Sequence, residues 1–130
     1  MVQDTLYCLM ITIHNKLITM IVGDKEWIDW YFTPYYEGFK RDRENNVPLT
    51  KEHIGMCVAR LPYKENEKKG ARKWSNEVYE ASTKVFKELY EYALETEGLI
   101  TANTSFEAFM GLIHSESFYK EVGYFGNQFG

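Results

Sequence analysis

At 130 residues, the chain has the length of a single domain. Apolar residues make up 45% of it and aromatic residues 16%, which is enough for a hydrophobic core and excludes disorder over the whole chain. The net charge of −4 argues against nonspecific binding to duplex nucleic acid, because like charges repel the phosphate backbone.

The cysteines and the N-terminal segment indicate a protein that works inside a cell. Two cysteines, Cys8 and Cys57, are too few for a disulfide framework, and both lie among apolar neighbours, so we expect buried free thiols in a reducing compartment. We expect no signal peptide, because no charged region and cleavage site are found, and no transmembrane helix, because polar residues interrupt the apolar stretch 6–22. The sequence thus predicts a cytoplasmic protein, in the host cytoplasm if it is viral, with no membrane partner.

The first predicted elements are two strands. Residues 6–13 and 17–22 are rich in apolar and β-branched residues, and residues 14–16 (His-Asn-Lys) can form a tight turn, since asparagine tolerates positive φ. Both runs are almost continuously apolar, which indicates strands that are covered on both faces. The alternative is one buried helix, because short apolar runs do not distinguish the two.

Two consecutive helices are predicted in the ring-rich segment that follows. Asp24 can cap the first helix. Its rings recur at spacings of three and four residues, at Trp27, Trp30 and Tyr31. The pair Thr33-Pro34 then predicts a new start, because threonine is a good N-cap and proline suits the first helical position.

For residues 50–62 the sequence predicts a helix or, alternatively, a third strand. Thr50 can cap a helix that Pro62 ends. Its apolar residues fall at helical spacing: Ile54, Cys57, Val58 and Leu61. Gly55 weakens the helix, so a strand over 54–61 is the alternative. The charged residues 63–73 are expected to form a solvated loop.

Three helices are predicted in the C-terminal half. The clearest begins after Ser75 and ends at Gly98. Its main apolar face consists of Val78, Ala81, Val85, Leu89, Tyr92 and Ala93. A capping box at 104–107 begins the second helix, and residues 117–122 form a short third one before an extended tail at 124–130.

Together these elements predict one compact domain, spanning residues 1–130, without an internal repeat or a linker. The predicted fold class is α+β and helix-dominated, with an N-terminal antiparallel β-hairpin packed by four to five helices.

Charge is distributed unevenly along the chain. Residues 40–73 contain ten basic and five acidic residues, whereas the remainder contains five basic and fourteen acidic ones. The basic segment either binds the phosphates of a nucleic acid or nucleotide, or is neutralised by acidic segments within the fold. The acidic end of the long helix opposes the helix dipole and would suit a basic partner.

A second functional cue is the density of rings between residues 27 and 39. A helix in so small a chain cannot bury rings on every side unless another surface covers it, and tryptophan and tyrosine dominate protein contacts. A protein partner or a second copy of the chain is therefore expected, and stacking on a base is the alternative. The candidate contact residues are Trp27, Trp30, Tyr31, Tyr35, Tyr36, Phe39, Lys40, Arg41, Arg43 and Arg60.

The sequence shows no established catalytic or metal-binding motif. No pair of histidines or cysteines has zinc-ligand spacing, and no glycine-rich phosphate loop or nucleophile elbow occurs. Two weak arrangements are His53 with Cys57, one helical turn apart, and Glu67 with Lys69, a spacing that a nuclease can use near a divalent metal. We predict neither a cofactor nor a bound metal.

The sequence favours a non-catalytic binding protein, a regulator or inhibitor that acts by contact with another macromolecule. Small inhibitors from phages and mobile elements have a similar composition. The alternatives are a binder of a phosphate-bearing ligand, which would use the basic segment 40–73, and a small hydrolase or nuclease. The rings and the opposed charges are also compatible with a homodimer or higher oligomer.

Overall fold

The computed structural model describes residues 8–13, 16–66 and 73–123, and the side chains of residues 21–65 and 73–123. The predicted tail at 124–130, most of the predicted turn at 14–16 and the pair Glu67 and Lys69 lie outside the described residues.

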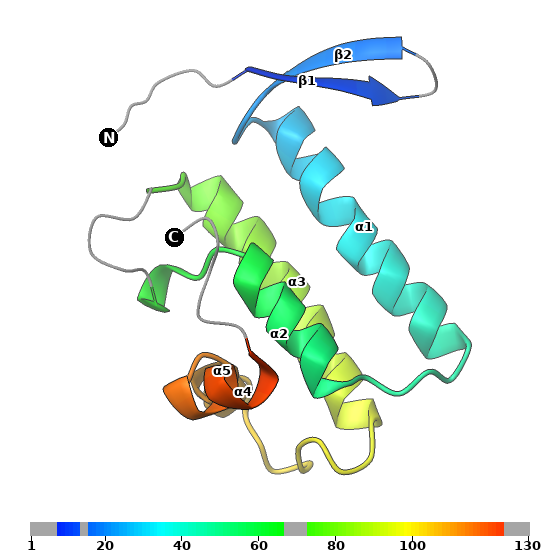
Figure 1. Cartoon of the computed structure of the whole chain (residues 1–130), viewed down its shortest axis with the longest axis vertical. Helices are drawn as coiled ribbons and strands as arrows, with labels where there is room; N and C mark the ends of the chain where they lie inside the picture. The colour runs from blue at the N-terminus through cyan, green and yellow to red at the C-terminus, as the bar shows by residue number, and fades with distance from the viewer. Residues whose placement is uncertain (1–7, 14–15, 67–72, 124–130) are drawn as a thin grey trace.

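Five α-helices dominate the described part of the chain (Figure 1). The elements in chain order are β1 (Cys8–Ile13), β2 (Lys16–Ile21), α1 (Lys25–Glu44), α2 (Lys51–Arg60), a 3-10 turn η1 (Lys64–Asn66), α3 (Asn76–Glu95), α4 (Phe106–Ile113) and α5 (Glu116–Val122). No helix among the described residues is long and apolar enough to cross a lipid bilayer.

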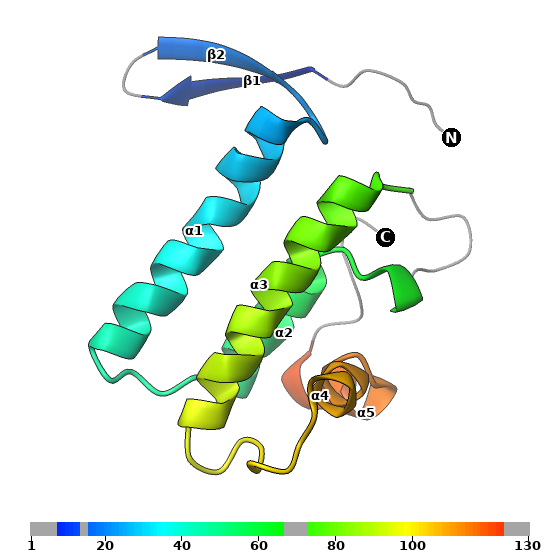
Figure 2. The same cartoon turned by 180° about the vertical axis from the view of Figure 1, so that it is seen from behind.

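The predicted α+β fold class is wrong, because the fold is built from helices. β1 and β2 run antiparallel beyond the N-terminal end of α1, and the helices do not pack around them (Figures 1 and 2). From Val22 to Gly123 the described chain forms helices and loops without a strand. The buried core side chains that the structure describes lie between Trp27 and Phe118. A pair of strands without a further strand or a covering layer is marginal by itself, so the helices carry the fold.

The prediction of two consecutive helices in the ring-rich segment is also wrong. Instead of two helices that restart at Thr33-Pro34, α1 runs continuously through Pro34. Proline has no N–H, so the carbonyl of Trp30 loses the donor that the fourth following residue normally supplies. Phe32 and Phe39, on either side of Pro34, are buried at 3% and 2% exposure, and α1 lies along α3 (Figure 2). This packing offsets the cost of an internal proline.

The other helices begin at side-chain caps. A hydroxyl accepts a hydrogen bond from the backbone N–H three residues later in each of α2, α3, α4 and α5, at Thr50, Ser75, Ser105 and Ser115 respectively. The predicted caps Thr50 and Ser75 are confirmed, and the alternative strand over 54–61 is wrong, because that segment is α2.

Some predicted helix ends shift by a few residues. Ser105 rather than Thr104 caps α4, since the Thr104 hydroxyl accepts from the Thr101 N–H at 3.3 Å. The long helix α3 ends at Glu95, before Gly98, which adopts a φ of +88° in the following turn. The short helix α5 begins at Glu116 and ends at Val122, the predicted end.

The core is a single cluster to which helices α1 to α5 all contribute. Helix α3 runs through its centre, with Val78, Val85, Phe86 and Leu89 without solvent exposure. Its Ser82 is also fully buried, and the hydroxyl donates to the carbonyl of Pro62 at 2.6 Å. This hydrogen bond joins the segment after α2 to α3.

Candidate functional site

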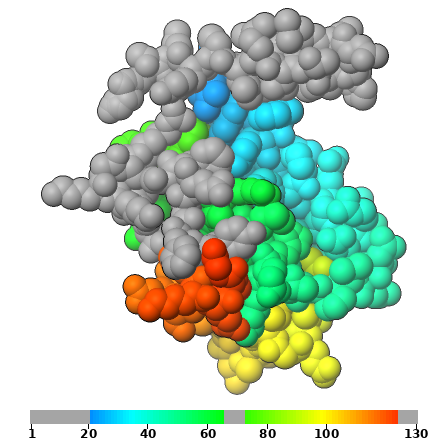
Figure 3. All heavy atoms as spheres, viewed as in Figure 1, coloured from blue at the N-terminus to red at the C-terminus, as the bar shows by residue number. Residues whose placement is uncertain are grey.

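A groove of about 600 Å³ lies between α1 and α2. Figure 3 shows the two helices next to each other on one face of the molecule. The groove is lined by Trp30, Tyr31, Pro34, Tyr35, Gly38, Phe39, Arg41 and Asp42 from α1, and by His53, Met56 and Arg60 from α2. Six of the ten candidate contact residues from the sequence lie here: Trp30, Tyr31, Tyr35, Phe39, Arg41 and Arg60.

The helical repeat explains why these side chains share one groove. On α1 the lining residues recur from Trp30 to Asp42 at spacings of three and four, so they form one stripe along the helix. On α2 the spacing of His53, Met56 and Arg60 forms the matching stripe. Each helix therefore gives one wall.

A hydrogen bond joins the two walls. The hydroxyl of Tyr31 donates to the backbone carbonyl of Arg60 at 2.8 Å. Burial raises the pKa of Tyr31 far above its usual value, and the neighbouring phenol of Tyr35 raises it further. Burial also raises the pKa of Tyr35. Both phenols therefore stay neutral at physiological pH and act as apolar surface with hydroxyl groups rather than as bases.

The groove carries an excess of positive charge. The Arg41 side chain is 69% exposed, and its Nε lies 3.4 Å from Oδ1 of the adjacent Asp42. The exposed side chain of Arg60 makes no ion pair with any residue that the structure describes. An exposed pair such as Arg41 and Asp42 contributes little energy, so both guanidinium groups can bind an anionic group of a ligand.

Trp30 is the most solvent-exposed aromatic residue that lines this groove. Its side chain is 37% exposed, whereas Trp27, one turn earlier on the same helix, is 4% exposed. Trp27 stacks between Tyr31, at 4.8 Å between ring centroids, and Trp74, at 5.4 Å. Trp27 is thus a core residue, and Trp30 is available for contact.

The remaining candidate residues lie elsewhere. Tyr36 lines a second groove, between α1 and α3, and Lys40 is exposed on α1 but lines neither groove. Among the candidate residues that do line the α1–α2 groove, Phe39 is the most buried. It is only 2% exposed, and its ring lies against those of Tyr92 and His53.

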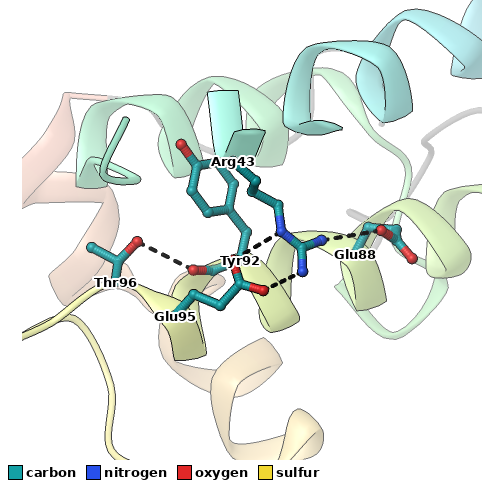
Figure 4. A network of polar contacts seen from close by, with 5 residues as sticks. All are labelled: Arg43, Glu88, Tyr92, Glu95 and Thr96. Carbon is teal, nitrogen blue, oxygen red and sulfur yellow. Dashed lines mark hydrogen bonds and ion pairs between the residues drawn. The ribbon is translucent and has the colours of Figure 1, made fainter. Parts of the chain in front are cut away.

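Arg43 forms ion pairs with acidic residues of α3 at the surface of the protein (Figure 4). Its Nε bonds Oε1 of Glu95 at 3.0 Å, its Nη2 pairs with the second oxygen of Glu95, and its Nη1 lies 3.5 Å from Glu88. The Arg43 guanidinium therefore holds the pKa of Glu95 below its ordinary value. For this part of the basic segment, the acidic end of α3 supplies the neutralising charge.

The basic segment therefore does not form one patch over its described residues. Lys51 pairs with Glu121 of α5 at 2.5 Å, and Arg43 faces α3, while Arg41 and Arg60 face the groove. The described part of the segment therefore offers several separate basic positions rather than one phosphate-binding surface.

The weak catalytic pair His53 and Cys57 has no activated thiol. Cys57 has no solvent exposure, and burial raises the pKa of its thiol to about 12. A thiol with this pKa stays protonated near neutral pH and is a poor nucleophile. Among the described residues, no group of three or more histidine, cysteine or acidic side chains is arranged to hold a metal ion.

From the α2 wall of the groove the sequence selected Arg60 but not the other two lining residues. Met56 was not singled out, and His53 was considered only as a partner of Cys57. The spacing of His53, Met56 and Arg60 does mark one helix face. Which other helix that face would lie beside depends on tertiary packing, which no local pattern contains.

Comparison with known proteins finds no relative: no family model matches the chain, and no curated protein or solved structure is similar to it.

Two half-buried histidines predict that acid destabilises the fold. Burial lowers the pKa of His53 and of His114 below the ordinary 6.5. His114 donates from Nδ1 to the Met110 carbonyl at 2.9 Å, and its Nε2 is buried without a partner among the described atoms. The unfolded chain therefore binds these protons first as the pH falls below about 6.5, so stability is full above that pH and declines below it.

Urea unfolding at about pH 7.5 and about pH 5.5 measures this dependence. The lower pH stays above the ordinary pKa of Glu95, 4.5, so that the Arg43 network is kept. The variant His114→Phe, which keeps a ring against Tyr63, should show a smaller change than the wild type. Equal or greater stability of the wild type at the lower pH would contradict the burial of these imidazoles.

Proposed function

We propose that the chain is a non-catalytic binding protein, a regulator or inhibitor, and that it contacts a protein partner through the α1–α2 groove. The observation that carries the proposal is the exposed Trp30 at a groove that also holds Arg41 and Arg60. Tryptophan, tyrosine and arginine are the residues that most often dominate the energy of protein interfaces. A cytoplasmic location accompanies this proposal, since the buried Cys57 thiol is free.

The second groove is a weaker candidate for a protein contact. It has a volume of about 580 Å³, and its lining includes four carboxylates and two lysines. Its rings are Phe32, which is 3% exposed, and the half-buried Tyr36. Burial of such charges against a partner costs desolvation energy, whereas the α1–α2 groove offers rings that are already partly exposed.

A phosphate-bearing small ligand is the second candidate for the α1–α2 groove. The observation that favours it is that two guanidinium groups, those of Arg41 and Arg60, line the same groove as Trp30. A base could stack on the indole while the phosphate binds the guanidinium groups. In that case a nucleotide should raise the melting temperature of the wild type but not of Arg41→Glu.

Gly38 offers a test that does not weaken the fold. A Cβ at this groove-lining position would meet only Arg41 Nη2, at 3.8 Å, which is ordinary contact. Gly38→Leu should therefore fill part of the groove, and replacing a helical glycine should raise stability by about 0.5–1 kcal/mol. Gly111→Leu on α4 is the matched control, because an added Cβ there meets nothing within 4 Å.

Affinity capture from a lysate of the source organism compares the three proteins. We expect the wild type and Gly111→Leu to retain the same partner, and Gly38→Leu to lose it. Retention of the same proteins by all three would contradict a contact through the groove. Self-association would appear as the chain itself among the retained proteins.

A further inference from the structure

We propose that the segment that binds the α1–α2 groove is an acidic peptide segment of the partner, anchored by one bulky apolar side chain. This inference rests on the proposed function and names the chemistry of the partner. It is carried by the length of the groove, its apolar walls and its net positive charge.

The length of the groove fits a peptide segment. Its lining on α1 runs from Trp30 to Asp42, which spans about 18 Å at 1.5 Å per residue. An extended segment of five or six residues covers about the same length, at roughly 3.3 Å per residue. A single side chain or a small ligand would fill only part of it.

The walls of the groove suit an apolar anchor. Tyr31, Tyr35 and Met56 line it as partly buried side chains, and Phe39 closes it towards the core. Methionine adapts to different shapes, and the two phenols stay neutral. A leucine, phenylalanine or tryptophan of the partner can bury its side chain here without leaving a charge unpaired.

The charges at the groove select carboxylates beside that anchor. Among the described residues that line the groove with Arg41 and Arg60, Asp42 is the one carboxylate, and it pairs with Arg41. His53 adds no positive charge at neutral pH, since burial lowers its pKa. Guanidinium groups bind carboxylates through two parallel hydrogen bonds, so an aspartate or glutamate on the segment completes the charge balance.

A peptide suits this groove better than a nucleic acid. A peptide can present few charges next to an apolar side chain, whereas a nucleic acid carries a phosphate at every nucleotide and would meet the overall net charge of −4 along its whole length.

Selection of displayed peptides tests the inference without a known partner. A random library of peptides of about 12 residues, longer than the groove when extended, is selected on the wild type. The pool is then depleted on Gly38→Leu, in which the groove is filled. We expect the surviving peptides to have a net negative charge and one bulky apolar residue. Their affinity should fall at least about tenfold for the double variant Arg41→Glu, Arg60→Glu.

Lys40→Glu is the matched control for charge, because Lys40 adjoins Arg41 on the same helix but does not line the groove. Affinity should change by no more than about twofold in this variant. Lysine in place of the peptide carboxylates should restore binding to the double variant.

Each outcome bears on one of the two proposals. Groove-specific peptides that are neutral or basic, or that bind the double variant undiminished, would overturn the acidic segment while leaving the contact groove intact. Failure to obtain any peptide that distinguishes the wild type from Gly38→Leu would overturn a peptide ligand altogether. The capture experiment with Gly38→Leu then decides separately whether the groove is a contact surface.

Discussion

Phe86→Ala is expected to lower the free energy of unfolding by about 3–5 kcal/mol, the usual range for truncation of a core phenylalanine. The Phe86 side chain has no solvent exposure. Its ring packs edge-to-face against Tyr63, at 6.1 Å between centroids, and against His114, at 5.4 Å. Truncation removes these contacts and leaves a cavity between α3, α4 and the segment after α2. Equilibrium unfolding in urea, at a fixed pH above 7, measures the loss.

Leu94→Ala is the matched control on the same helix. Leu94 is 38% exposed, so its truncation should cost less than about 1 kcal/mol. Both Phe86 and Leu94 are large apolar residues of α3, and the structure buries Phe86 but leaves Leu94 partly exposed. Equal unfolding midpoints of the two variants would show that this side of α3 is not packed as described.

Helix starts and the long helix α3 could be predicted from the sequence because their signals are local. A hydroxyl side chain at Thr50 or Ser75 bonds an N–H only three residues away. The apolar face of α3 repeats over five turns, long enough to exclude a strand. Such features need no knowledge of the rest of the fold.

The fold class could not be predicted in the same way. The apolar runs at 8–13 and 16–21 do have the pattern of paired strands. An apolar pattern indicates which faces avoid water, but it does not tell which element covers them. Here the helices form a core of their own between Trp27 and Phe118, so the prediction of helices packed around the two strands was wrong.

The continuity of α1 depends on tertiary packing. Locally, Thr33-Pro34 is a good signal for a helix start, and a proline inside a helix costs about 3 kcal/mol. The burial of Phe32 and Phe39 on either side of Pro34, against the rest of the core, favours one continuous helix. A local rule was outweighed by contacts distant in sequence.

The candidate site was predictable mainly on the α1 wall of the groove. The rings of α1 at helical spacing, with Arg41 beyond them, are visible in the sequence, and Arg60 was selected for its charge alone. The ion pairs of Arg43 with Glu95 and Glu88 were not visible, because these carboxylates lie 52 and 45 residues away along the chain, respectively. Ion pairs of this kind decide which basic residues are left for a ligand.

Trp30→Ala is expected to weaken binding of the captured partner by at least about 30-fold, which corresponds to about 2 kcal/mol. The same substitution should lower the free energy of unfolding by no more than about 1 kcal/mol, because the side chain is already 37% exposed. Trp27→Ala provides the contrast in stability. Trp27 is 4% exposed and stacks on two rings, so its truncation should lower the free energy of unfolding by about 3–5 kcal/mol.

The dissociation constant of the captured partner for Trp30→Ala, measured beside that for Lys40→Ala, tests the contact groove most directly. Both residues lie on α1, but only Trp30 lines the groove. If the partner binds in the groove, Trp30→Ala should lose much of its affinity, Lys40→Ala should keep it, and both variants should be folded. Wild-type affinity in folded Trp30→Ala would contradict binding in the groove.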